Sequence, residues 1–251
     1  MNISTKGIIL KTMDFNEDDL LITIFSLKQG KIVVIARNAK KVKSKFAPVS
    51  NIFVYGEFDI YIGKNWNYLN DISINRAFYS IREDIEKMSY GSYFLELTLA
   101  CIYSNRPDKR NFILLLKTLA FLQETTNYNL LKVIFEYKLI SNLGYNPNIY
   151  DCSNCKSSLK NNIKFSVKNG GMLCNSCDFN DSMNISKKIL KIFQYIDSNK
   201  IEDIIKIEIN SVFLKKLDII LYKYISYYLE KSDFKSLKFI KLFKEEKWKL
   251  L

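Results

Sequence analysis

Four of the five cysteines form two pairs with the same internal spacing, and this pattern restricts the fold more than any other feature of the chain. Cys152 and Cys155 are separated by two residues, as are Cys174 and Cys177, and 18 residues lie between the pairs. The spacing C-x2-C-x18-C-x2-C is typical of a ribbon in which four thiolates hold a structural zinc ion. We expect residues 149–181 to form such a ribbon around one zinc ion, with Ile163–Val167 and Gly170-Gly171 forming a hairpin that brings the second cysteine pair to the first.

Other interpretations of the cysteine pairs remain open. Four thiolates can hold an iron–sulfur cluster, and two pairs can form disulfides or a redox-active dithiol. The N-terminal residues lack the apolar run of a secretion signal, which favours a reducing cytoplasm and disfavours disulfides. The fifth cysteine, Cys101, lies in an apolar helical segment and is expected to be a core residue.

A basic stretch is the second informative feature. From Leu20 to Gly56 the chain has seven Lys or Arg residues and no Asp or Glu. The β-branched run from Ile32 to Ile35 predicts a buried strand that leads into a loop, and nothing nearby in the sequence neutralises that loop. A solvated lysine-rich face is the alternative to a polyanion-binding surface. The expected nucleic-acid contacts are Lys31, Arg37, Lys40, Lys41, Lys43, Lys45 and, as a ring that stacks on a base, Phe46. Tyr55 or Tyr61 could stack in the same way, and packing on the helical domain is the alternative for all three rings.

Composition narrows the function classes. A net charge of +12 over 251 residues favours nucleic acid as a partner, although part of the excess reflects a lysine-rich composition overall. The absence of histidine excludes Ser-His-Asp and Cys-His catalysis and every zinc site that needs histidine. No run of 18 apolar residues occurs, so we expect no spanning helix, no membrane partner and a cytoplasmic location.

The periodicity predicts an α+β fold. Residues 3–75 read as five short strands with a long loop after the third, which fits an oligonucleotide-binding (OB-fold) β-barrel in residues 1–78. An SH3-like barrel fits this pattern nearly as well. Residues 79–251 read as an α-helical domain into which the zinc ribbon is inserted.

Several helix ends are predicted as well. Ser80 and Glu83 form a possible capping box, and Gly144 stands where the helix of residues 129–143 should end. Residues 236–248 form a basic amphipathic segment, for which a helix that closes a bundle is a commoner outcome than one that lies on a membrane surface.

The order of these parts resembles the bacterial RecO family of recombination and DNA repair proteins. The resemblance covers nearly the whole chain, although only the cysteine spacing is specific by itself. It is carried by TKGIILK (5–11), DFNEDD (14–19), GK (30–31), ARNAKK (36–41), SKF (44–46), LGYNP (143–147), GG (170–171) and KSLKF (235–239). The family often has Gly at the position of Asn38, but Asn tolerates left-handed backbone better than most residues.

The resemblance implies a non-enzymatic protein. RecO-like proteins bind single- and double-stranded DNA, anneal complementary strands, contact the C-terminal tail of single-strand-binding protein, and act with RecR to load RecA. A nucleoid-associated protein of the RecFOR pathway is therefore expected.

Two alternatives belong to other function classes. A zinc-ribbon transcription or translation factor would also combine a ribbon with net positive charge. A metal-dependent nuclease would need the acidic cluster at Asp14, Glu17, Asp18 and Asp19 to bind magnesium, although consecutive acids in a loop are usually solvated.

Overall fold

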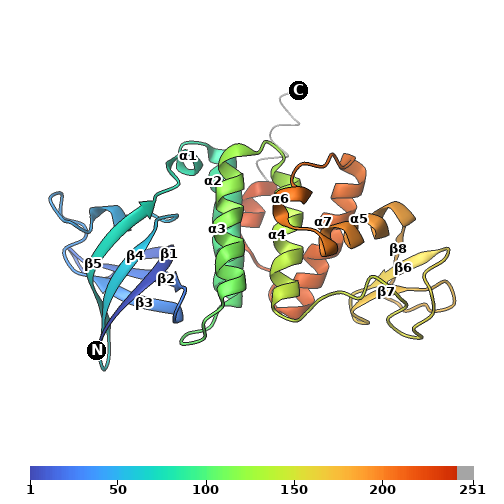
Figure 1. The fold of residues 1–251 in the computed structure, drawn as a ribbon, viewed down its shortest axis with the longest axis horizontal. Helices are drawn as coiled ribbons and strands as arrows, with labels where there is room; N and C mark the ends of the chain where they lie inside the picture. The colour runs from blue at the N-terminus through green and yellow to red at the C-terminus, as the bar shows by residue number, and fades with distance from the viewer. Residues whose placement is uncertain (242–251) are drawn as a thin grey trace. The chain divides into compact units, whose positions relative to one another are not determined.

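The computed structural model describes residues 1–241, and its contacts divide the chain into two compact units. The first unit comprises Met1–Glu124 together with the segment that begins at Lys235, and the second comprises Thr125–Phe234. Figure 1 shows the elements of each unit along the chain. The predicted domain boundary after residue 78 stays a prediction.

The first unit contains a closed five-stranded barrel. Its strands are β1 (Asn2–Asp14), β2 (Leu20–Ser26), β3 (Gly30–Ala36), β4 (Tyr55–Ile62) and β5 (Asn67–Arg76). They follow one another in the order β1-β2-β3-β5-β4, and β1 pairs with β4 to close the barrel. β3 runs parallel to β5, and the other neighbours are antiparallel. The predicted OB-fold barrel and the α+β class are confirmed.

Strand β1 closes the barrel because both of its edges are paired. Its first half pairs with β4 and its second half with β2, and a register shift between Ile9 and Lys11 bends the strand between them. Gly7 lies where the two pairings overlap. A Cβ there would lie 2.5 Å from Ile24 Cγ2, so the strand needs glycine at this position.

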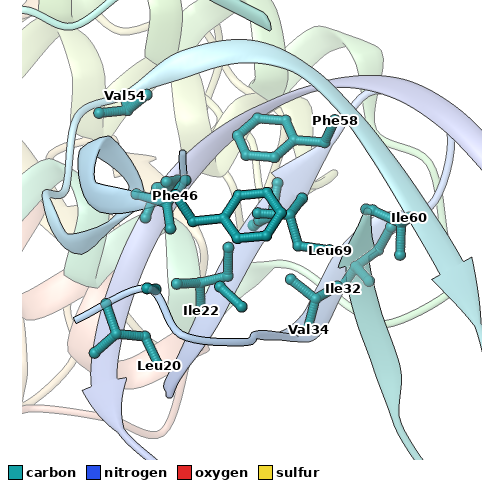
Figure 2. Close-up of a cluster of buried hydrophobic side chains, with 14 of the residues drawn as sticks. Leu20, Ile22, Ile32, Val34, Phe46, Val54, Phe58, Ile60 and Leu69 are labelled. Carbon is teal, nitrogen blue, oxygen red and sulfur yellow. The ribbon is translucent and has the colours of Figure 1, made fainter. Parts of the chain in front are cut away.

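Alternate residues of the strands point into one apolar core, which Figure 2 shows. The labelled core side chains are Leu20, Ile22, Ile32, Val34, Phe46, Val54, Phe58, Ile60 and Leu69. Phe46 is only 7% exposed and precedes the short helix η1 (Ala47–Ser50), which packs on β1 and β2. The prediction that Phe46 stacks on a base is therefore wrong, because its ring fills the barrel core.

Helices follow the barrel in the first unit. They are α1 (Tyr79–Arg82), α2 (Ile85–Cys101) and α3 (Lys109–Glu124). The predicted capping box at Ser80 and Glu83 is wrong, because Asp84 begins α2 instead. Its Oδ1 accepts hydrogen bonds from the amides of Glu86 and Lys87, at 2.8 and 3.0 Å. Asp is a strong N-cap because it satisfies amides that the first turn leaves free.

The second unit combines helices with a small sheet. Its helices are α4 (Tyr128–Asn142), α5 (Lys187–Ser198), α6 (Ile201–Ile204) and α7 (Ser211–Tyr228), and its strands are β6 (Ile163–Ser166), β7 (Gly171–Leu173) and β8 (Met183–Ile185). The sheet order is β7-β6-β8. Gly144 has a φ of +88° just after α4, which confirms the predicted helix end.

A buried ion pair joins two helices of this unit. Lys132 on α4 is 3% exposed, and its Nζ lies 2.7 Å from Glu136 on the same helix and 2.5 Å from Asp218 on α7. Burial alone would lower the pKa of Lys132, but the two carboxylates outweigh it and raise the pKa above its usual value. The ammonium therefore stays charged and holds α4 to α7.

The chain returns to the first unit at a helical turn over residues 235–241. Glu96 on α2 accepts hydrogen bonds from the amides of Lys235 and Ser236, at 3.1 and 3.0 Å. Residues 242–248 of the predicted amphipathic helix lie outside the described residues. Among residues 1–241, no helix is both long and apolar enough to span a bilayer.

Replacing Phe46 by Ala should lower the free energy of unfolding by about 3–5 kcal/mol, since it opens a cavity in the barrel core. Phe46→Leu should lose less, and it should bind single-stranded DNA as tightly as the parent chain. Chemical denaturation and fluorescence anisotropy measure the two quantities. A folded Phe46→Leu variant with weakened DNA binding would contradict the core placement.

Candidate nucleic-acid interface and metal centre

Two tight turns present the four predicted zinc ligands. In the first turn the amide of Lys156 donates to the carbonyl oxygen of Cys152, and in the second the amide of Cys177 donates to that of Cys174, at 2.9 and 3.2 Å. The hairpin of β6 and β7 brings the second turn to the first, as the sequence predicts, and Gly170 takes a φ of +68° at its tip.

The four sulfur atoms form one cluster. All of them lie within 4.8 Å of one another, and the Sγ atoms of Cys155 and Cys174 are 3.6 Å apart. A zinc ion bound tetrahedrally at about 2.3 Å from each sulfur would separate the sulfurs by about 3.8 Å. The four sulfur atoms therefore fit around a single metal ion. An iron–sulfur cluster contains several iron atoms and would hold the thiolates further apart.

Hydrogen bonds at the cluster act unequally on the thiols. The hydroxyl of Ser157 is the main cause that lowers the pKa of the Cys174 thiol to about 6, against the opposing effect of desolvation. Asn154 Nδ2 donates a hydrogen bond to Cys177 Sγ at 3.4 Å, but the neighbouring thiols outweigh this donor and raise the pKa of Cys177 to about 11. Metal ions bind the deprotonated form of cysteine, so Cys174 is the thiol that these contacts best prepare for a metal.

The cluster supports the packing around the small sheet. Cys152 is fully buried and packs with Leu173, while Phe165 on β6 stacks on Phe193 of α5 with ring centroids 6.1 Å apart. All four ligands come from the protein, so a bound ion would keep no open coordination position for a substrate. A metal ion bound there would therefore have a structural role. Cys101, by contrast, is buried in α2, as predicted.

Cys152→Ser should release the bound metal and lower the melting temperature, because coordination in isolated zinc fingers is worth on the order of 10 kcal/mol. Metal analysis by mass spectrometry and thermal melting measure the two effects. Cys101→Ala is the matched control, since it removes a buried thiol outside the cluster and should keep the metal. A parent protein without zinc, and a Cys152→Ser variant that melts like it, would contradict a zinc site.

The predicted basic contacts lie on β3 and on the loop that follows it. Arg37 is exposed, and its guanidinium lies 4.2 Å from the ring centroid of Tyr68 on β5. Asn38 has a φ of +55°, so it takes the left-handed conformation that Asn tolerates better than most residues. Its amide donates to Asp19 Oδ1 at 2.8 Å. The chain therefore makes the turn into the basic loop with Asn at this position.

The expectation that nothing neutralises this loop is wrong for three of its lysines. Their partners come from the end of β1, from the β1–β2 loop and from β5. The ion pairs are Lys40–Asp14 at 3.4 Å, Lys41–Asp18 at 3.1 Å and Lys45–Asp71 at 3.1 Å. The hydrogen bond from Lys45 also holds the pKa of Asp71 below its usual value.

The other predicted cations have no carboxylate partner within residues 1–241. Arg37 and Lys43 are exposed, and Lys31 is half-buried on β3. The structure therefore divides the predicted contacts into three unpaired cations and three paired ones. Because the pairs are exposed, each is worth only about 0–1 kcal/mol and a phosphate can replace the carboxylate.

The acidic loop does not form a convergent metal site. Asp14 and Asp18 face different lysines, and Asp19 accepts hydrogen bonds from the Asn38 amide and from Asn16 Nδ2. These carboxylates hold the β1–β2 loop against the basic loop. Sequence reasoning could not find this contact, since it joins segments that separate strands bring together.

Sequence reasoning also missed an aromatic contact beside the cations. Phe15 in the β1–β2 loop and Trp66 before β5 meet edge to face, with ring centroids 5.2 Å apart. Trp66 is 44% exposed. The available signal was a tryptophan three residues after Gly63, in the segment between β4 and β5.

Removing the competing carboxylates should strengthen DNA binding. The double change Asp14→Asn and Asp18→Asn frees Lys40 and Lys41, and we expect about two- to tenfold tighter binding of an oligo(dT) strand at low salt. Fluorescence anisotropy at fixed ionic strength measures the change.

A matched control for this variant is Glu57→Gln with Asp59→Asn, which changes the net charge equally on the outer face of β4. An equal gain in both variants would show that only net charge matters. No gain in the first variant would exclude Lys40 and Lys41 as phosphate contacts.

Comparison with known proteins identifies relatives of this chain. The family described as "Recombination protein O N terminal" matches residues 1–78, and the family described as "Recombination protein O C terminal" matches residues 82–238. A protein of Alkaliphilus metalliredigens named DNA repair protein RecO is 31% identical over 244 residues, which cover 96% of this chain and 99% of the relative.

Two further relatives carry the same name. The protein of Acetivibrio thermocellus is 32% identical over 225 residues, which cover 88% of this chain and 90% of the relative. The protein of Oceanobacillus iheyensis is 34% identical over 223 residues, which cover 87% of this chain and 85% of the relative. The likeness therefore extends across both compact units.

Proposed function

This chain belongs to the recombination protein O family of DNA repair proteins, and from that premise we propose that it is a recombination mediator. It binds single- and double-stranded DNA and anneals complementary strands. Together with RecR it helps to load RecA onto DNA that is coated with single-strand-binding protein. The task involves no chemical step, and it places the protein with the DNA in the cytoplasm.

The cationic loop on the closed barrel carries this proposal. Lys31, Arg37 and Lys43 would neutralise phosphates and release counterions, which gives affinity without sequence preference. Lys40 and Lys41 would join them when phosphates displace Asp14 and Asp18. Annealing needs two strands that repel each other to be held close together, and a surface with several exchangeable cations lowers that repulsion.

The four cysteines would hold one structural zinc ion. The tight cluster of their sulfur atoms supports this assignment. Zinc would fix the two cysteine turns and the sheet of the second unit, and it would take no part in DNA chemistry.

A groove on the second unit is a candidate dock for the tail of single-strand-binding protein. Its volume is about 430 Å³, and it combines an apolar floor with basic residues. Its lining includes the apolar residues Ile192, Ile207 and Phe213, the basic residues Lys188 and Lys191, and one acidic residue, Glu208. A peptide that carries both carboxylates and an apolar residue would match this combination.

A strand-annealing assay with labelled complementary oligonucleotides tests the proposal. The parent chain should accelerate annealing with bare strands and with strands coated by single-strand-binding protein. The triple change Lys31→Ala, Arg37→Ala and Lys43→Ala should slow annealing. It should also make the plot of the logarithm of the DNA-binding constant against the logarithm of salt concentration less steep by about 2, or roughly 0.7 per lost contact.

The matched control is Lys187→Ala with Lys215→Ala and Lys216→Ala, which removes three charges from α5 and α7 of the second unit. It should keep the parent salt slope. A parent chain that binds DNA but never anneals it would contradict the mediator role, and an unchanged slope in the barrel variant would exclude these cations.

A further inference from the structure

A pocket of about 500 Å³ lies at one edge of the barrel, within the first unit. Its walls come from β3, from the β4–β5 turn, from the N-terminus and from the link between α2 and α3. The lining residues include Lys31, Asn65, Trp66, Asn67 and Asn105. The volume falls in the range of about 300–1,000 Å³ that is usual for pockets that hold small organic groups.

The backbone around this pocket is fixed. The amide of Lys31 donates to the carbonyl oxygen of Tyr103 at 3.0 Å, so β3 is bonded to the link between α2 and α3. Asn67 Nδ2 donates to the carbonyl oxygen of Val33 at 3.0 Å, which ties the start of β5 to β3. The walls are therefore formed in the free protein, and a ligand need not order them.

Trp66 supplies an aromatic wall whose orientation is set by a neighbour. Phe15 meets it edge to face at an interplanar angle of 63°, and the tryptophan side chain nevertheless stays 44% exposed. Exposing a large ring is unfavourable, and a rigid exposed ring beside a pocket is the arrangement that stacks on planar ligands.

Polar groups of two kinds accompany the ring. Lys31 lines the pocket and has no carboxylate partner within residues 1–241. Asn65 and Asn105 also line it, and their side-chain amides make no hydrogen bond within the described part of the chain. An ammonium matches a phosphate, and an amide offers both a donor and an acceptor to the edge of a base.

We propose that this pocket binds one unpaired base of a single-stranded DNA chain, stacked on Trp66, with Lys31 on the adjoining phosphate. The inference rests on the proposed DNA-binding function and deepens it. It assigns the stacking role to Trp66, where the sequence had suggested Phe46. Since both amides can donate and accept, any base fits, and the pocket distinguishes unpaired bases from paired ones.

A comparison of two oligonucleotides separates stacking from charge. One is oligo(dT) of about 16 nucleotides, and the other is an abasic strand with the same number of phosphates. Trp66→Ala should weaken binding of oligo(dT) about 5- to 150-fold and leave binding of the abasic strand unchanged. Trp66→Phe should retain most of the affinity. Tyr79→Ala is the matched control, because it removes another exposed ring of the first unit and should change neither affinity.

Tryptophan fluorescence gives a second measurement. If Trp66 had only a structural role, DNA binding would not change its emission. The chain has only one other tryptophan, Trp248, so Trp248→Phe leaves Trp66 as the sole reporter. Oligo(dT) should quench its emission, whereas the abasic strand should not. This measurement needs no change at Trp66 and therefore remains valid if Trp66→Ala folds poorly.

The outcomes separate the two proposals. Equal affinity of the parent chain for both strands, with unchanged Trp66 emission, would overturn the base pocket and leave the DNA-binding function intact. Loss of affinity for both strands in Trp66→Ala, without quenching in Trp248→Phe, would assign Trp66 to folding and also overturn the pocket. A parent chain that binds neither strand would overturn both proposals.

Discussion

Strand β1 pairs along both of its edges, and the rest of the barrel depends on this double pairing. Its first half holds β4 and hence the turn that carries Trp66, while its second half holds β2 and ends at Asp14, where the acidic loop begins. One bent strand thus positions the aromatic ring and the carboxylates that meet the basic loop. Gly7 lies where the two pairings overlap, and a side chain at this position would overlap Ile24.

Charge interactions determine which lysines of the basic loop are paired in the free protein. Lysines that follow one another in a short loop repel, and the carboxylates of Asp14, Asp18 and Asp71 offset part of that repulsion in the free protein. Exposed pairs are weak and screened by salt, so a chain of phosphates can replace the carboxylates at little cost. The acidic loop therefore acts as an internal counterion for part of the surface, while Lys31, Arg37 and Lys43 remain unpaired within residues 1–241.

Local patterns predicted much of this structure, and long-range contacts account for what they missed. The strands, the hairpin between the cysteine pairs and the helix end at Gly144 follow from periodicity and turn chemistry, which depend on neighbouring residues. The prediction that Phe46 stacks on a base was wrong, because nothing in the local sequence of a basic loop shows that the chain folds this ring back into the barrel. The partners of Lys40 and Lys45 were missed for the same reason, as was the contact between Phe15 and Trp66.

The central claim is that the cations of the barrel contact DNA, and lysine reactivity measures this directly. Brief acetylation of the full chain with and without saturating oligo(dT), followed by peptide mass spectrometry, reports the protection of each lysine. The account predicts strong protection of Lys31, Lys40, Lys41 and Lys43 and little change at Lys188 and Lys191. Unchanged reactivity of the four barrel lysines while DNA is bound, or protection only in the second unit, would contradict it.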